Sequence, residues 1–346
     1  MNRDRWIVLT TIQAPTPALA GIAKLCHGKW GIVVVGDLNT PADWSHQGVE
    51  FLPVERQKEM FGTFAELIPY RHYCRKNLGY LYAIQNGAKL ILDIDDDNIP
   101  YESFGHGLDR EVTGRLLNGA QWANVYRHFI EDTRIWPRGL PLDEIESTGE
   151  LSARAQSFTC PIQQFLADND PDVDAIFRLT TTGEFFFRKD APPVVLEREC
   201  WSPFNSQNTV FFAEAFPLLY LPCHVSFRMT DIWRSFVAQA ALWHHNLRVS
   251  FHAPTVQQRR NQHDLKKDLA QELIGYMSNR KIAQTLSQMR ATIPPSDSLE
   301  GAALRLWQSL ESIGIILPEE IAILREWFAQ CKSFGSVQDR HHDDDN

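Results

Sequence analysis

In the first hundred positions, short continuous apolar runs alternate with segments in which apolar residues recur every three or four positions, as in a helix. The apolar runs are rich in Val, Ile, Leu and Trp, which favours strands. Thr16 and Pro17 suit the cap and the first position of a helix that ends at Gly28. Alternating strands and helices favour parallel βαβ units. We predict strands over 6–12, 30–35, 49–54 and 88–92, and helices over 17–27 and 71–86.

The pattern changes twice further along the chain. Residues 100–193 contain frequent Pro, Gly and aromatic residues, which indicates a mixed sheet with long loops; strand residues mix with acids over 172–179. A strand is predicted over 218–227, followed by a helix over 235–243 that Thr230 or Asp231 is able to cap. From about 262 the spacing becomes helical. We expect a main α/β domain over 1–275, a helical appendage over 276–335 and a disordered tail over 336–346.

The apolar run that ends at Leu92 leads into Asp95, Asp96, Asp97 and Asn98. In open α/β sheets, ligands bind beyond the carboxyl ends of the strands. Adjacent carboxylates repel one another unless a cation lies between them, and Mg²⁺ or Mn²⁺ prefers carboxylate oxygen together with phosphates and water. The pattern therefore predicts a metal-bridged diphosphate site, with a solvated acidic turn as the alternative. The triplet at 343–345 follows no strand and indicates only charge in a polar tail.

Composition narrows the class of protein. The 346 residues are 44% hydrophobic and 22% charged, with a net charge of −9, which argues against a general nucleic-acid binder. The six cysteines are scattered without a C-x-x-C pair, as in reduced core thiols. No apolar run approaches the ~20 residues of a membrane span. We expect a cytoplasmic protein; an oligomer is possible, but the sequence does not determine it.

Several blocks of sequence occur in order between residues 6 and 275. They are Trp6–Pro17, Val33–Asp37 with Thr40–Trp44, Pro69-Tyr70 with Arg75–Ile84, Asp95–Asn98, Trp136–Gly139, Asn205–Thr209 and Asp231–Ser235. As an ordered set they resemble the STELLO family of glycosyltransferases. A more distant similarity is to the plant reversibly glycosylated proteins, which are UDP-arabinopyranose mutases and also carry an aspartate triplet and an Asp-x-Trp block.

The resemblance implies a GT-A-like, Rossmann-like nucleotide-sugar-binding domain over 1–275 with a DxD-type metal motif. It further implies a metal-dependent glycosyltransferase with a nucleotide-sugar donor, expected to be UDP-linked, an unknown acceptor, and Mn²⁺ or Mg²⁺ as cofactor. The plant members are Golgi membrane proteins, a location that we do not transfer to this chain. Two alternatives stay open: a UDP-sugar mutase of the same fold, and a non-catalytic scaffold that binds a partner protein. The position matching the mutases' glycosylated arginine falls near Ile145.

Within the acidic motif, Asp95 and Asp97 are the predicted metal ligands, because alternate side chains of an extended segment share a side. Asp96 then points towards a ribose or a supporting partner. A later metal or diphosphate contact is predicted for His263, for which a structural role is the alternative. His252 is comparable.

The nucleotide-sugar contacts are predicted from strand ends, a helix start and two polar blocks. Strand ends supply Thr10, Thr11 and Asp37, the last as an acceptor for a base N–H or as a turn residue. Arg75 and Lys76 stand at the predicted start of a helix, where positive side chains and the helix N-terminus both favour the binding of a phosphate group. Asp231 is the predicted catalytic base or acceptor-positioning acid, unless it only caps its helix, and Asp174 is the weaker alternative. The remaining predicted contacts are Arg75, Lys76, Arg138, Asn205, Gln207 and Asn208, with Trp201 or Trp233 able to stack on a sugar.

Overall fold

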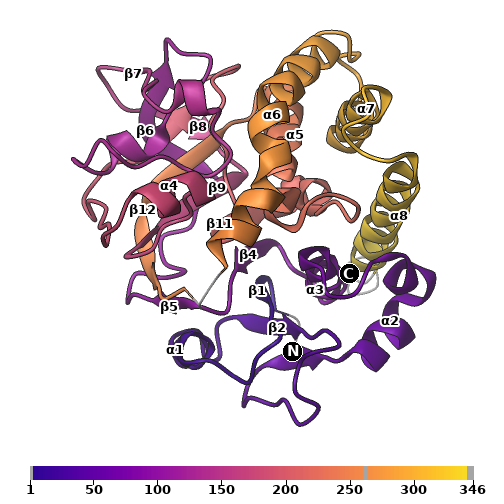
Figure 1. Ribbon diagram of the computed structural model, residues 1–346. Coiled ribbons are helices and arrows are strands. Elements are labelled where there is room, and N and C mark those ends of the chain that lie inside the picture. Colours follow the sequence, from indigo (N-terminus) through magenta and orange to yellow (C-terminus); the bar gives the residue numbers. More distant parts are fainter. Residues whose placement is uncertain (1–2, 261–263, 341–346) are drawn as a thin grey trace.

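The computed structural model describes residues 3–260 and 264–340, and its strands form one mixed sheet (Figure 1). The strand order is β3-β2-β1-β4-β11-β9-β12-β10-β6-β7, with β5 on β12 and β8 on β6. An α/β fold with a mixed central sheet and C-terminal helices is thus confirmed. The strands are β1 (Arg5–Thr10), β2 (Gly31–Val35), β3 (Glu50–Leu52), β4 (Leu90–Ile94), β5 (Asn98–Pro100), β6 (Glu111–Asn118), β7 (Glu150–Leu151), β8 (Gln156–Thr159), β9 (Ile162–Asp168), β10 (Val194–Leu196), β11 (Asn208–Phe212) and β12 (Val249–Gln258).

Helices cover both faces of this sheet. Helix α1 begins at Pro17 and is capped by the Thr16 hydroxyl, as the sequence predicts. The other α-helices are α2 (Val54–Leu67), α3 (Lys76–Gln85), α4 (Ala175–Thr180), α5 (Thr230–His244), α6 (Leu265–Arg290), α7 (Leu299–Ser312) and α8 (Pro318–Arg340). In Figure 1, α5 to α8 gather on one side of the molecule and β6 to β8 on the other.

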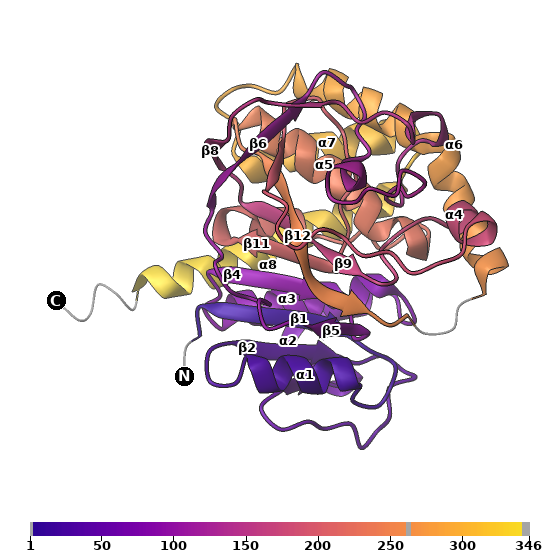
Figure 2. The same ribbon diagram turned by 90° about the vertical axis from the view of Figure 1, so that its left-hand side faces the viewer.

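The first four core strands are parallel, so their carboxyl ends meet at one edge of the sheet. β1 lies between β2 and β4, and β3 extends the sheet beyond β2. Figure 2 shows β4, β1 and β2 side by side, and α1 packs on the face that β1 and β2 form. β11 then runs antiparallel to β4, pairing Thr209 with Asp93, and brings the second half of the chain to the same edge.

The predicted helix over 71–86 begins later, as a short 3-10 turn over Tyr73–Arg75 followed by α3. Helix α2 was not predicted; its central Gly62 has φ 48° and interrupts the helix. A strand over 218–227 is wrong, since 3-10 turns over Ala213–Leu219 and Phe227–Met229 occupy that region. Pro217 and Pro222 there have no N–H to give a sheet.

The structure adds detail in two further regions. The segment 172–179 contains α4 rather than a strand, because the Asp174 carboxylate accepts a hydrogen bond from Phe177 N and caps a helix. At the C-terminal end, α8 continues to Arg340, past the tail boundary at 335; residues 341–346 lie outside the described residues. The predicted start of the appendage at 276 falls within α6.

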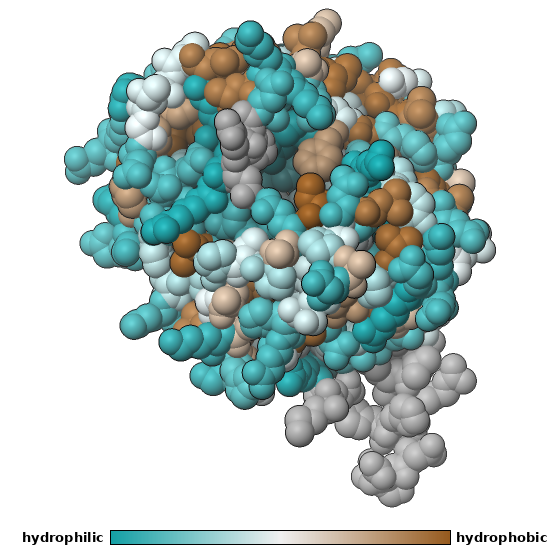
Figure 3. All heavy atoms as spheres, turned by 60° about the horizontal axis from the view of Figure 1, so that its bottom comes forward, coloured by the Kyte–Doolittle hydropathy of each residue, from teal (hydrophilic) through white to brown (hydrophobic). Residues whose placement is uncertain are grey.

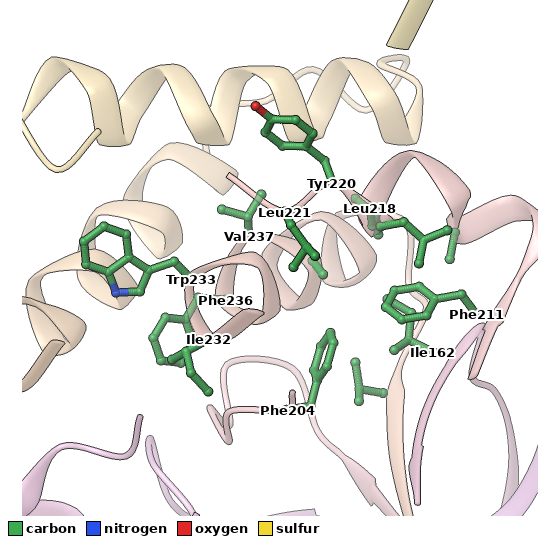
Figure 4. Close-up of a cluster of buried hydrophobic side chains, with 14 of the residues drawn as sticks. Ile162, Phe204, Phe211, Leu218, Tyr220, Leu221, Ile232, Trp233, Phe236 and Val237 are labelled. Carbon is green, nitrogen blue, oxygen red and sulfur yellow. The ribbon is translucent and has the colours of Figure 1, made fainter. Parts of the chain in front are cut away.

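Helix α5 lies at the centre of the larger hydrophobic core. Every residue from Thr230 to Trp243 is buried. Figure 4 shows Ile232, Trp233 and Phe236 from α5 with Tyr220 and Leu221 of the preceding segment, beside Phe211 of β11. Because α5 is packed on all sides, its first turn is held rigidly at the edge of the sheet.

Glu320 fixes the C-terminal helices to this layer. Its carboxylate is 1% exposed and accepts hydrogen bonds from Cys223 N and His224 N, both 2.8 Å long, and from the Tyr220 hydroxyl. The acid in the first turn of α8 therefore caps backbone groups of another segment instead of facing solvent. None of the described helices is long and apolar enough to cross a membrane.

Gly79 permits α3 to lie close to the sheet. A Cβ at this position would lie 2.6 Å from Val8 Cγ1 and 2.7 Å from Val35 Cγ2. Both valines belong to central strands that have no space to move. We predict that Gly79→Ala lowers the free energy of unfolding by about 1–3 kcal/mol, measured by urea denaturation.

The matched control is Gly301→Ala in α7, where the nearest atom to the added Cβ lies 3.4 Å away. This change relieves the conformational entropy cost of a helical glycine and is expected to stabilise by about 0.5–1 kcal/mol. Equal effects of the two substitutions would contradict the close α3–sheet packing.

Candidate active site

A pocket of about 470 Å³ lies at the edge where the parallel strands end. Figure 3 shows a hollow with hydrophilic walls on this face, with apolar spheres on its rim. The exposed side chains of Ile12 and Phe227 belong to the lining. The other lining residues are Thr10, Thr11, Gln13, Asp37, Asn39, Arg71, His72, Tyr73, Asp95, Asp96, Asp97, Arg138, Asp172, Asn205, Gln207, Arg228, Asp231, Gln258 and Arg260.

The three aspartates after β4 reach the pocket in different directions. Asp95 Oδ1 accepts from the Tyr73 hydroxyl and lies 3.3 Å from Lys76 Nζ. Asp97 Oδ2 accepts from Gln258 Nε2 at 3.1 Å. Asp96 instead accepts from the hydroxyl of Thr11. Each of the three carboxylates therefore has its own protein partners.

Burial raises the pKa of all three carboxyl groups. For Asp97 burial and the nearby charge of Asp95 raise the pKa to about 7, against the opposing effect of Arg260 and Gln258. For Asp95 the burial effect exceeds the opposing charge of Lys76. Asp96 is raised by burial and lowered in part by its hydrogen bond from Thr11. Burial thus disfavours the charged form of these three carboxyl groups.

Lys76 supports this motif from behind instead of lining the pocket. The side chain is fully buried, and its Nζ lies 2.6 Å from Asp93 Oδ1 and 2.7 Å from the carbonyl of Ile94. Nζ also donates to the Tyr73 hydroxyl at 3.0 Å. The predicted phosphate contact of Lys76 is therefore wrong, because its charge is used by Asp93 and by the backbone of the motif.

The end of the pocket near β1 and β2 presents hydroxyls and one acid. The Thr10 hydroxyl lines the pocket and donates to the carbonyl of Val35, so the hydroxyl oxygen can still accept a hydrogen bond from a ligand. Asp37 Oδ2 accepts from Arg71 N at 2.6 Å, and Oδ1 accepts from Leu38 N. Arg71 has φ 54°, a left-handed conformation that directs its N–H at this carboxylate. Each oxygen of Asp37 keeps a second lone pair for a ligand.

At the opposite end, Arg138 lies between two carboxylates. Its guanidinium donates to Asp172 through Nε and Nη2, and to Asp231 through Nη1 at 3.1 Å and Nη2 at 2.9 Å. Burial acts to raise the pKa of Asp172, but the charge of Arg138 and its hydrogen bonds hold that pKa below its ordinary range. Arg138 lines the pocket, but its hydrogen bonds go to Asp172 and Asp231, which is the structural ion pair that was the alternative to a phosphate or acceptor contact.

Asp231 lines the pocket but is not a cap of α5. Ser206 N and Ile232 N donate to its carboxylate in addition to Arg138. These donors fix the position of the Asp231 carboxylate at the pocket wall. Next to it, Asn205 and Gln207 lie on the same wall, and Gln207 Nε2 donates to the side chain of Gln258.

Three predicted contacts lie elsewhere. Arg75 is fully buried, donates to Gln57 Oε1 and to the carbonyl of Ile68, and stacks on the ring of Tyr70. Asn208 lies inside the sheet and donates to Thr255 Oγ1. Asp174 caps α4 and accepts from Trp136 Nε1 at 2.6 Å. These three predictions are therefore wrong, because structural partners occupy the side chains. His263 lies outside the described residues, and Trp201 and Trp233 are core residues.

Some lining residues were missed by the sequence analysis. Tyr73 and His72 precede the block at Arg75, and Arg228 precedes the block at Asp231. Asp172 was not separated from its acidic neighbours, although an aspartate two positions from Asp170 repeats the spacing of Asp95 and Asp97.

The donor set of the pocket fits a hard divalent cation. Asp95 Oδ2 is turned away from Tyr73 and Lys76, whose contacts are to Oδ1. Carboxylate oxygens suit Mg²⁺ or Mn²⁺, which commonly take one or two carboxylates and complete their shell with phosphate oxygens and water. Within residues 3–260 and 264–340, no group of three or more His, Cys, Asp or Glu side chains has the arrangement of a complete metal site.

The pocket is acidic as a whole. Six aspartates and four arginines line it among the described residues, a formal excess of two negative charges. Burial lowers the pKa of His72, so its imidazole adds no positive charge near neutral pH. A diphosphate in this pocket would meet net repulsion unless a cation accompanied it.

Comparison with known proteins identifies relatives in plants. The profile of the STELLO glycosyltransferases matches residues 228–340. The chain is 33% identical over 273 residues to the probable glycosyltransferase STELLO2 of Arabidopsis thaliana, and 33% identical over 274 residues to STELLO1 of the same plant. Each alignment covers 73% of this chain and 35% of the relative, so the chain spans about a third of the length of these proteins.

Among solved structures, the crystal structure of a mycobacterial protein aligns over 85% of this chain and 76% of that chain. Its TM-score of 0.40 and identity of 12% are too low to establish a shared fold. The sequence relatives are the informative comparison. The ordered blocks and both alignments agree, and the chain is a homologue of the STELLO glycosyltransferases, the family that its sequence indicated.

Proposed function

We propose that this chain is a metal-dependent glycosyltransferase that moves a sugar from a nucleoside-diphosphate donor, expected to be a UDP-sugar, to an acceptor. The observation that carries the proposal is the acidic pocket itself. Three aspartates converge with Asp172 and Asp231 where the parallel strands end, and the lining has a formal excess of negative charge. Relatedness to the STELLO glycosyltransferases supports the same class of reaction.

The pocket has a natural direction for such a donor. Hydroxyls and the Asp37 carboxylate suit a base and ribose at the β1–β2 end, whereas Asn205 and Gln207 suit sugar hydroxyls at the other end. The diphosphate then lies between these ends, beside Asp95 and Asp97. Those two carboxylates would hold Mg²⁺ or Mn²⁺, which neutralises charge that develops on the leaving diphosphate.

The carboxylates around Arg138 have a supporting role in this proposal. In the transfer, the bond between the anomeric carbon and the diphosphate breaks and a bond to the acceptor oxygen forms. Asp231 is held by Arg138, Ser206 and Ile232, so it is suited to position the sugar or the acceptor. This favours the acceptor-positioning role over that of a general base.

The first test is calorimetric titration of UDP and GDP into the protein. With Mn²⁺ present we predict UDP binding that EDTA abolishes, and at least a tenfold loss of affinity in Asp97→Ala because one of the two carboxylates that hold the cation is removed. Asp109→Asn, which changes an exposed acid away from the pocket, is the control and should bind as wild type does.

Failure of the wild-type protein to bind any nucleoside diphosphate with Mn²⁺ or Mg²⁺ would overturn the proposal and favour the scaffold alternative. If UDP-sugars instead leave a sugar on the protein, detected by intact mass, the mutase alternative gains support. A donor screen with purified UDP-sugars then identifies the sugar.

The pKa of Asp97, raised to about 7, predicts how cation binding depends on pH. A cation replaces the proton, so the apparent Mg²⁺ affinity should rise by about tenfold between pH 6 and pH 8. Thermal shift titrations with Mg²⁺ at constant ionic strength measure this rise. A flat profile would contradict the assignment of Asp97 as a ligand.

The same raised pKa affects stability in EDTA. An unfolded aspartate titrates near 3.9, so between about pH 4 and pH 7 the folded protein keeps a proton that the unfolded chain has released. The contribution of Asp97 to the free energy of unfolding therefore falls as pH rises through this range. In Asp97→Asn this fall is absent, so the stability of the variant relative to wild type increases towards pH 8.

Tyr73 joins Asp95 to Lys76 through its hydroxyl. Tyr73→Phe keeps the ring but releases the Asp95 carboxylate from its orienting partner, and about a tenfold weaker Mg²⁺ affinity is expected, with uridine binding unchanged. Isothermal titration of each ligand separates the two effects. Tyr101→Phe is the control, because its hydroxyl also donates to an aspartate, Asp168, outside the pocket lining. Equal losses in the two variants would contradict the positioning role.

A further inference from the structure

The arginines at the acidic end of the pocket differ in how completely they are satisfied. Arg138 uses Nε, Nη1 and Nη2 in hydrogen bonds to Asp172, Asp231 and the carbonyl of Arg228. It has one carboxylate on each side, and its charge is more than balanced. A phosphate gains little from such a guanidinium, so the positive contact of the pocket must come from other residues.

Arg228 presents one half of its guanidinium to the pocket. Nε donates to Glu272 Oε1 on α6 at 2.9 Å, and Nη2 lies 2.8 Å from the same oxygen. Although that ion pair is close, the buried Nη2 makes no aligned hydrogen bond. The remaining nitrogen, Nη1, has no hydrogen bond to any described residue. The Glu272 carboxylate thus fixes the plane of the guanidinium while leaving its outer edge unused.

Arg260 is held in the same partial way on the other wall. Its Nε lies 3.4 Å from Asp170 Oδ2 without an aligned hydrogen bond, and Nη2 donates to Gln258 Oε1 at 3.3 Å. Asp170 is shared with Arg178, whose Nη1 contacts the other carboxylate oxygen. Asp170 is thus shared by two arginines, and of the two only Arg260 lines the pocket.

The chain brings Arg260 to the metal motif. Arg259 N donates to the carbonyl of Asp97 at 3.0 Å, so the end of β12 is joined to the acidic segment. The charge of Arg260 also opposes the rise in the pKa of Asp97. A ligand beside Asp97 therefore lies within the field of this guanidinium.

We propose that Arg228 and Arg260 bind the diphosphate of the donor next to the cation site formed by Asp95 and Asp97. This inference rests on the proposed function, since it concerns the same pocket. Guanidinium groups match the oxygens of a phosphate with two parallel N–H donors and keep their charge at any working pH. Partly satisfied, pre-oriented arginines suit an anion that arrives with a ligand and departs with it.

The experiment compares uridine, UMP and UDP binding in the presence of Mg²⁺ by calorimetry. Arg260→Gln is expected to weaken UDP binding by about tenfold, to weaken UMP binding less and to leave uridine binding unchanged, because only the phosphates face the lost charge. Arg228→Lys, which keeps a charge for Glu272 but loses the planar fork, is expected to weaken UDP binding by about three- to tenfold.

Arg178→Gln is the matched control. It removes the same charge from the same partner, Asp170, but outside the pocket lining. UDP affinity within about twofold of wild type is expected there. Arg260→Lys tests folding, because it retains the charge and should bind UDP with an affinity between those of wild type and Arg260→Gln.

The outcomes separate the two proposals. If wild type binds UDP and both pocket variants bind it equally well, the diphosphate role of these arginines is overturned and the proposed function stands. If Arg178→Gln loses as much affinity as Arg260→Gln, the effect is general electrostatics and the inference again fails. If wild type binds no nucleoside diphosphate, both proposals fail together.

Discussion

The concentration of carboxylates at one sheet edge is the constraint on which the rest of the structure depends. Asp93 is fully buried in β4, and Asp95, Asp96 and Asp97 follow it within the pocket. Such acids repel one another and lose hydration on burial, so a chain that carries them must supply cations nearby. Helices that pack on the sheet supply these positively charged side chains.

Two buried cations meet Asp93 from different helices. Lys76 comes from the first turn of α3, and Arg234 from the first half of α5, 3.1 Å from Asp93 Oδ2. Arg234 also donates to Ser206 Oγ, which ties α5 to the segment before β11. The removal of either cation would leave a buried charge uncompensated. Compensation of one aspartate therefore fixes α3 and α5, which pack on the same face of the sheet, relative to the pocket.

The sequence alone predicted the parts of the fold that depend on local pattern. The strands of the first half, the Thr16 cap and the acidic turn after β4 follow from periodicity and from residue chemistry. It failed for Arg75 and Lys76, because a cation at a helix start suits a phosphate and a buried partner equally well. Only long-range packing, with Gln57 and Asp93 as partners, decides between them. Asp172 was likewise invisible, since its partner Arg138 lies 34 positions away.

A chain of side-chain amides crosses the pocket wall. Gln258 donates through Nε2 to Asp97 and accepts at Oε1 from Gln207. An amide has distinct donor and acceptor ends, so the charge on Asp97 fixes which end of Gln258 faces Gln207. Gln258 Oε1 also accepts from Arg260 Nη2, which can only donate, so the amide is held in one orientation from both ends. The direction of the hydrogen bonds along this wall is therefore set before any ligand arrives, and a molecule that enters the pocket meets donors and acceptors in a fixed order.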